Sequence, residues 1–129
     1  MERLKLRYKD AVKAAKTLED ILKQPYSVII RDAAIQRFEY TFEALWKFLK
    51  DYLKEKEGVI ANSPKACFKD IFSSGFLSEG LTEDFLDMTD MRNETSHTYK
   101  EEVAQAIYDK LNKYSSLIKN LLAKFKENI

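Results

Sequence analysis

The sequence predicts an all-α fold: an antiparallel four-helix up-down bundle with one extra short helix. The first observation is composition, because only three glycines and two prolines interrupt a chain rich in Lys, Glu, Leu and Ala. The second is spacing, since apolar residues recur at intervals of three and four along long segments, as one face of a helix requires. The third is the length of 129 residues, which predicts that 1–129 forms a single domain.

The first helix is expected from about Glu2 to Lys23, because Pro25 prevents its continuation. Its apolar stripe consists of Leu4, Tyr8, Ala11, Ala15, Leu18 and Leu22. Six basic residues lie off this stripe: Arg3, Lys5, Arg7, Lys9, Lys13 and Lys16. Two interpretations of this basic side stay open, a solvated face and a track for a polyanion.

The second helix is the longest, expected from about Ser27 or Val28 to Glu57, with Gly58 as its stop. Its main apolar stripe consists of Ile35, Phe38, Phe42, Leu45, Leu49 and Leu53. A second stripe lies opposite, formed by Tyr40, Ala44 and Phe48. A helix that is apolar on two sides must be covered on two sides. Either the chain itself or another subunit covers the second stripe, with Tyr40 and Phe48 as candidate dimer contacts.

The short helix is expected between a cap at Ser63, followed by Pro64, and a stop at Gly75. It carries the only cysteine, Cys67, which we interpret as a small buried hydrophobe and not a nucleophile. One cysteine rules out an intramolecular disulfide and fits a reducing compartment.

Two further helices complete the predicted bundle. Thr82 is the expected cap of the fourth, whose first turn carries Glu83 and Asp84 at the positive end of the helix dipole. The last is expected from about Glu101 to Glu127. Its apolar stripe consists of Val103, Ile107, Leu111, Tyr114, Ile118, Leu121 and Phe125.

Charge and motif content limit the possible functions. The charged fraction is 33% but the net charge is only +1, so overall charge does not predict nucleic-acid binding. The longest aliphatic run, at Val28, is too short to cross a bilayer, and we expect a cytoplasmic protein with no membrane contact. Glycine-rich phosphate loops and paired metal-ligand motifs are absent from the sequence, so we expect no cofactor and no metal.

The candidate site lies between the fourth helix and the last, in the segment Met91–Tyr99, which contains the only histidine, His97. On a continuous helix Arg92 and His97 would point about 140° apart, whereas Asn93 and His97 would share a face. The segment that follows Glu94 consists of weak helix formers. The sequence therefore allows a break in the helix that turns His97 back toward Arg92.

A histidine near an arginine is a minimal set of groups for cleaving RNA without a metal. His97 would transfer a proton at the ribose 2′-hydroxyl or the leaving 5′-oxygen, and Arg92 would stabilise charge on phosphorus. One histidine supplies one proton-transfer group, so a symmetric homodimer would supply the second. Asn93 would orient the histidine or bind phosphate, and Tyr99 offers a ring for base stacking and a hydroxyl for modification. The structural alternative is that His97 closes a helix end while Arg92 pairs with Asp90, Glu94 or Glu101.

The segment Arg92–Tyr99 resembles the Arg-x4-His-x-Tyr signature of the HEPN superfamily. The segment Arg31–Lys47 resembles one branch of it, the nucleotidyltransferase substrate-binding proteins. The resemblance implies one HEPN-like helical domain over 1–129 that forms a dimer. It also implies that the protein is encoded beside an MNT-type nucleotidyltransferase. In HepT-like members the arginine and histidine form a metal-independent ribonuclease site in the dimer cleft, which implies Arg92 and His97 as the catalytic pair here. It also implies Asn93 as a supporting residue and Tyr99 as the acceptor that the partner adenylylates.

Three functions are open at this point. The first is a ribonuclease toxin of a two-component toxin–antitoxin module, which predicts that His97→Ala abolishes RNA cleavage. The second is a non-catalytic subunit that binds nucleotide or substrate for a minimal nucleotidyltransferase. The third is a structural interaction module, which would bury the side chains of the motif.

Overall fold

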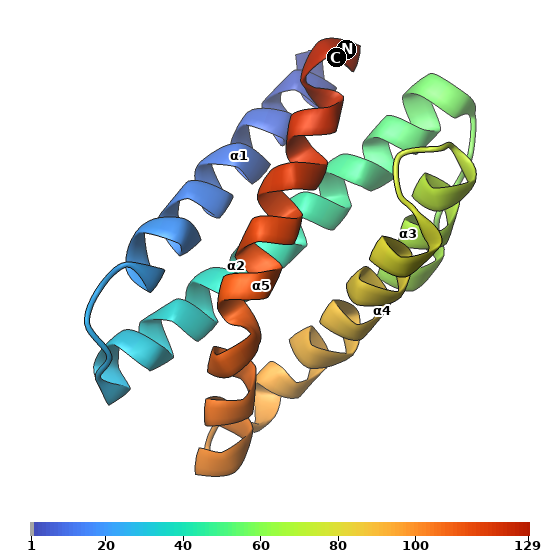
Figure 1. The fold of residues 1–129 in the computed structure, drawn as a ribbon. Coiled ribbons are helices and arrows are strands. Elements are labelled where there is room, and N and C mark those ends of the chain that lie inside the picture. The colour runs from blue at the N-terminus through green and yellow to red at the C-terminus, as the bar shows by residue number, and fades with distance from the viewer. Residues whose placement is uncertain (1) are drawn as a thin grey trace.

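The computed structural model describes residues 2–129, and within that range it contains helices and no strand, which confirms the all-α prediction. The five α-helices are α1 (Glu2–Leu22), α2 (Val28–Tyr52), α3 (Pro64–Ser73), α4 (Glu79–Glu94) and α5 (Glu101–Phe125). Figure 1 shows α5 crossing α2, with α1 on one side of α2 and α3 and α4 on the other. The turn between α4 and α5 lies at the opposite end of α5 from the chain terminus.

The core lies where α1, α2 and α5 meet. All six residues of the main stripe predicted for α2 are buried, and so are Leu4, Ala11 and Leu18 of α1. Phe38 stacks on Tyr114 of α5 with ring centroids 5.7 Å apart. Burial of this apolar surface is the dominant favourable contribution to folding, at about 25 cal/mol per Å².

The second stripe of α2 is covered within the chain at Phe48. This ring is fully buried and lies edge-on to Tyr8 of α1 at 5.2 Å and to Phe125 of α5 at 5.4 Å. Phe48 is therefore wrong as a candidate dimer contact, because α1 and α5 wrap around that side of α2. Tyr40 remains 42% exposed, and its hydroxyl is hydrogen-bonded to that of Thr17 on α1.

Helix boundaries agree with the predictions except at α4. Ser63 caps α3 as expected, and Ser27 caps α2, each through its hydroxyl oxygen. A π-helical turn extends the end of α2 to Glu57, and Gly58 stops it with a left-handed φ of 66°. The predicted cap of α4 was wrong: Ser78 caps the helix, and Thr82 lies one turn inside it with its hydroxyl bonded to the Ser78 carbonyl. Both residues are good caps, and the sequence alone did not decide between them.

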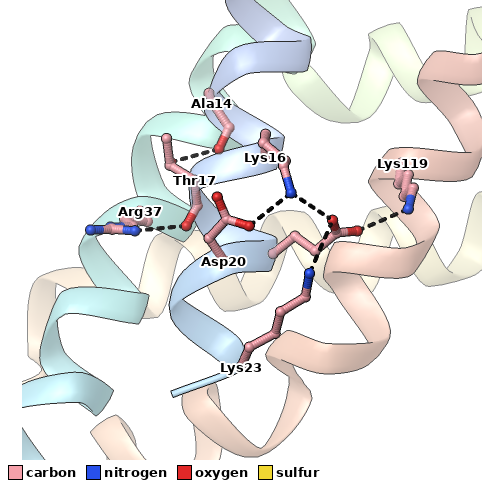
Figure 2. A network of polar contacts seen from close by, with 8 residues as sticks. Ala14, Lys16, Thr17, Asp20, Lys23, Arg37 and Lys119 are labelled. Carbon is pink, nitrogen blue, oxygen red and sulfur yellow. Dashed lines mark hydrogen bonds and ion pairs between the residues drawn. The ribbon is translucent and has the colours of Figure 1, made fainter.

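Polar contacts hold α1 to its neighbours at the surface, as Figure 2 shows. Arg37 of α2 donates to the backbone carbonyl of Thr17 at 2.8 Å, and Lys119 of α5 pairs with Glu19 at 3.0 Å. Lys16, which belongs to the basic side of α1, pairs with Asp20. Part of that basic side is therefore neutralised by acids on the same helix. Within residues 2–129, no helix is long and apolar enough to span a membrane.

Candidate functional site

The helix break predicted near the motif is present. α4 ends at Glu94, a 3₁₀ turn covers Thr95–His97, and α5 begins at Glu101. Thr95 is buried, and both its backbone N–H and its hydroxyl donate to the carbonyl of Arg92, the hydroxyl at 2.7 Å, so this residue closes the helix end. The geometry of a continuous helix, which would hold Arg92 and His97 on different faces, therefore ends before His97.

Arg92 points toward α2 and bridges two helices. Its Nη2 lies 3.2 Å from Oε1 of Glu43, and the other oxygen of that carboxylate accepts a hydrogen bond from the indole of Trp46, also at 3.2 Å. The Arg92 side chain is 28% exposed. Its Nε is buried and has no hydrogen-bond partner among the described residues. The guanidinium is thus held in place but not fully satisfied.

His97 lies on the solvent side of the turn. Its ring is exposed, and within residues 2–129 it makes no side-chain hydrogen bond; its nearest ring is Tyr99, with centroids 6.1 Å apart. Tyr99 is 77% exposed, and Lys100 Nζ lies 5.8 Å from the centre of its ring. Asn93 is exposed, and its backbone carbonyl accepts a hydrogen bond from Ser96. These three side chains of the motif are therefore open to solvent, whereas a purely structural module would bury them.

The structure does not join Arg92 to His97 directly. In the part of the chain that is described, the two side chains share no hydrogen bond, and Arg92 is engaged by Glu43. The structural alternative for Arg92 named Asp90, Glu94 and Glu101, and none of these is its partner in residues 2–129; Asp90 pairs with Lys65 instead. Joint action on one phosphate would require a ligand between the two groups or a second copy of the chain.

A second arginine fixes the far side of the turn. Arg31, at the start of α2, has a side chain only 3% exposed, and its two terminal nitrogens bind both oxygens of Glu101 at 2.8 and 3.0 Å. Its Nε donates to Asp32 at 3.1 Å. The hydrogen bonds from Arg31 hold the pKa of Glu101 below its ordinary value, and the same contacts raise the pKa of Arg31. The first residue of α5 is thereby tied to α2.

Cys67 does not belong to this site. It is fully buried, and burial raises the pKa of its thiol to about 12. A thiol of this kind is not a nucleophile near neutral pH, as the sequence predicted. No group of three or more His, Cys, Asp or Glu residues within 2–129 is placed to hold a metal ion.

Sequence reasoning missed Glu43, Trp46 and Arg31. All three lie in the α2 segment that carried the family resemblance, but none was given a role. Glu43 and Trp46 are three residues apart and so share a helix face. That spacing was a usable signal. The sequence gives no comparable signal for the pairing of Arg92 with Glu43 or of Arg31 with Glu101, because the partners are 49 and 70 residues apart.

A family model described as "Nucleotidyltransferase substrate binding protein like" matches residues 6–127. A curated relative from Haemophilus influenzae, named probable ribonuclease HepT, is 36% identical over 84 residues, which cover 63% of this chain and 57% of the relative. The match thus spans little more than half the length of that relative.

Solved structures share the fold. A crystal structure of a protein from Thermus thermophilus has 43% identity and a TM-score of 0.86, covering 90% of this chain and 98% of the other. A mutant of the toxin–antitoxin complex MntA–HepT has a chain with a TM-score of 0.81 and 11% identity, with 98% and 99% covered. A Haemophilus influenzae structure, described as the fold of a substrate-binding domain of a nucleotidyltransferase, has a TM-score of 0.64 and 24% identity, with 97% and 98% covered. At these two lower identities the likeness shows the fold alone.

Proposed function

Because the chain belongs to the nucleotidyltransferase substrate-binding protein-like family, we propose that it is the HEPN-type ribonuclease toxin of a two-component module. Its partner in this proposal is a nucleotidyltransferase of the MNT type that acts as antitoxin. The probable ribonuclease HepT, at 36% identity, supports this choice of activity. The four long helices would serve as an antiparallel up-down bundle that presents the α4–α5 turn to RNA.

One observation carries the proposal: an exposed imidazole without a hydrogen bond lies in the 3₁₀ turn that directly follows the helix end carrying an incompletely satisfied guanidinium. His97 is exposed and its ring makes no hydrogen bond within residues 2–129, so a bound ribose can reach the imidazole. Arg92 makes a single hydrogen bond within residues 2–129, to Glu43, and its side chain is 28% exposed, so it retains capacity for an anion.

The proposed reaction is transesterification at a phosphodiester. The imidazole of His97 takes the proton from the ribose 2′-hydroxyl, and the 2′-oxygen forms a bond to phosphorus while the bond to the 5′-oxygen breaks. The leaving 5′-oxygen gains a proton from an imidazolium. Arg92 stabilises the negative charge that gathers on the non-bridging oxygens. The products are a 2′,3′-cyclic phosphate and a 5′-hydroxyl.

A homodimer supplies the second proton-transfer group in this proposal. Each chain contains a single histidine, and base and acid catalysis at one phosphate call for two. Two exposed His97 turns related by a twofold axis would place both imidazoles in one cleft. Asn93, which is exposed beside Arg92, would bind a phosphate oxygen or orient the imidazole.

The test is RNA cleavage by the purified protein and growth arrest on its expression, compared with His97→Ala. Loss of general acid–base catalysis typically costs about 10²–10⁴-fold in rate, so cleavage and arrest should both disappear. The variant should keep the circular dichroism spectrum and elution volume of the wild type, because the His97 ring is exposed. Wild-type cleavage rates in His97→Ala would contradict the proposal.

The second candidate is a non-catalytic subunit that binds nucleotide or substrate for the nucleotidyltransferase, as the description of the family suggests. It predicts that nucleotide binds only when both chains are present and that the isolated chain leaves RNA intact.

Under the first proposal Tyr99 is the residue adenylylated by the partner, supported by the 77% exposure of its side chain. Intact mass measured after co-expression with the partner tests this, with Tyr99→Phe as the control.

A further inference from the structure

A basic groove of about 440 Å³ lies between the start of α1 and the second half of α2, and the site described above does not use it. Its cationic residues are Arg3, Arg7, Lys47, Lys50 and Lys54, and Asp51 is the one acid in its lining. The net charge of the whole chain, only +1, therefore conceals a strongly positive local surface.

The charges of this groove are only partly neutralised. Asp51 serves both arginines, with its Oδ2 lying 3.4 Å from Arg3 Nε and 3.1 Å from Arg7 Nε. Lys50 Nζ lies 5.4 Å from the centre of the Trp46 ring, a cation–π contact that leaves its charge in place. Lys47 and Lys54 are exposed and form no ion pair within residues 2–129. The groove thus offers cations without partners of their own.

The groove adjoins Arg92 through Trp46. The indole of Trp46 lines the groove and shares the Glu43 carboxylate with Arg92. Glu43, Lys47, Lys50 and Lys54 follow one another at intervals of four, three and four residues, so they form a single row along α2 and the π-helical turn that extends it. The negative end of this row, Glu43, is already paired with Arg92. The row therefore connects the motif to the groove, and its one acid is already neutralised by Arg92.

We propose that this groove binds the phosphate backbone of single-stranded RNA and leads the strand to Arg92. A positive groove beside an aromatic ring is the combination that single-stranded nucleic-acid sites use, with phosphates on the cations and a base on the ring. Trp46 is the ring at this position, and it is half-buried, so one part of it is open to a base. The inference rests on the proposed function, because it names the path of the RNA substrate. Arg3 and Arg7 are then the part of the basic side of α1 that contacts the strand.

The experiment measures binding in a cleavage-deficient background so that binding and catalysis are separate. His97→Ala protein is titrated with a mixed-sequence single-stranded RNA of about 12 nucleotides, a length within the range that single domains cover. The test variant adds Lys47→Ala and Lys54→Ala. The control adds Lys9→Ala and Lys13→Ala, which remove the same charge from exposed residues of α1 outside the groove.

We expect the groove variant to bind RNA about tenfold more weakly than its parent, and the control variant to bind as the parent does. Each phosphate contact contributes about 0.7 to the slope of log affinity against log salt for single strands, so the slope should fall by about 1.4. Equal weakening in both variants, unchanged affinity in the groove variant, or no RNA binding by the parent would each overturn the groove proposal.

Two outcomes separate this inference from the proposed nuclease. Cleavage by the wild type together with unchanged RNA binding in the groove variant would overturn the groove and leave the nuclease standing. RNA binding that depends on Lys47 and Lys54, in a wild-type protein that does not cleave, would support the groove and overturn the nuclease. Loss of the nucleotidyltransferase from pull-downs of the groove variant, with RNA affinity intact, would identify the groove as a protein-docking face and overturn the proposal.

Discussion

Two arginine–glutamate pairs join α2 to the α4–α5 region, and they differ in how completely each arginine is satisfied. Arg31 is buried, binds both oxygens of Glu101 and uses its remaining Nε on Asp32. Arg92 is partly exposed, makes one bond of 3.2 Å to Glu43, and keeps a buried Nε without a partner in residues 2–129. In each pair one partner belongs to α2, and the other belongs to α4 or α5.

The difference indicates separate roles for the two residues. A buried guanidinium whose three nitrogens all donate to carboxylates inside the protein has a structural role, because binding another anion would break bonds it already makes. A guanidinium held by a single bond is positioned and still able to receive a phosphate. The completeness of hydrogen bonding separates a structural arginine from a functional one, even where both pair with glutamate.

The largest expected effect is on catalysis by Arg92→Ala. Removing a donor that stabilises developing charge should lower kcat by about 10²–10³-fold. The free energy of unfolding should change by less than about 1 kcal/mol, because a partly exposed ion pair contributes little. Single-turnover RNA cleavage and urea denaturation measure the two quantities. A large loss of stability with full activity would reverse the roles assigned to the two arginines.

The next effect is on stability by Arg31→Met. The variant loses both charged hydrogen bonds to Glu101, and we expect it to be destabilised by about 1–2 kcal/mol. Cleavage per folded molecule should stay at the wild-type level, because the hydrogen bonds of Arg31 go to Glu101 and Asp32 and not to the proposed catalytic residues. Thermal unfolding and activity normalised to the folded fraction test this. Glu101→Gln is the companion variant, and it should show a smaller loss because the amide oxygen still accepts from Arg31.

Glu43→Gln addresses how Arg92 is positioned. The neutral amide can still accept one hydrogen bond but holds the guanidinium less firmly, so kcat should fall by up to about tenfold. Removing a negative charge next to the bound phosphate should lower KM. The matched control is Glu39→Gln, one turn earlier on α2, where both constants should be unchanged. A fall in kcat equal in the two variants would show that the effect is not specific to Arg92.

The smallest effect is the pH dependence of the stability that the Arg31–Glu101 ion pair contributes. Arg31 holds the pKa of Glu101 below its ordinary value of 4.5, so this contribution is complete above pH 4.5 and is lost as the pH falls through the lowered value. The difference in free energy of unfolding between wild type and Arg31→Met should therefore be constant well above pH 4.5 and shrink as the pH falls below it. Urea titrations at several pH values measure it. A difference that stays constant with pH would show that the ion pair is not its source.

The helices were predictable from the sequence because their apolar residues keep one periodicity over many turns. The stripe from Ile35 to Leu53 is buried throughout, and the serine cap at Ser63 marked the start of α3. The start of α4 was not predictable, since Ser78 and Thr82 are both good caps. The burial of Phe48 was also out of reach, because it depends on how α1 and α5 cross α2.

The candidate site was predictable in part. A run of weak helix formers indicated the break after Glu94, and the single histidine drew attention to His97. The ion pairs Arg92–Glu43 and Arg31–Glu101 could not be predicted from the sequence, because pairs between distant helices leave no local pattern. The sequence analysis saw only the α1 side of the basic groove, as excess charge, and not that Lys47, Lys50 and Lys54 of the next helix face it.

Trp46 is the only tryptophan in the chain, and its indole stands between the basic groove and the Glu43 carboxylate that holds Arg92. Intrinsic fluorescence excited at the red edge of protein absorption therefore reports from this one place. A nucleobase stacked on the indole would quench the emission, and release of the indole N–H from Glu43 would shift its wavelength. The unlabelled protein thus carries its own optical probe for the arrival of a ligand beside the motif.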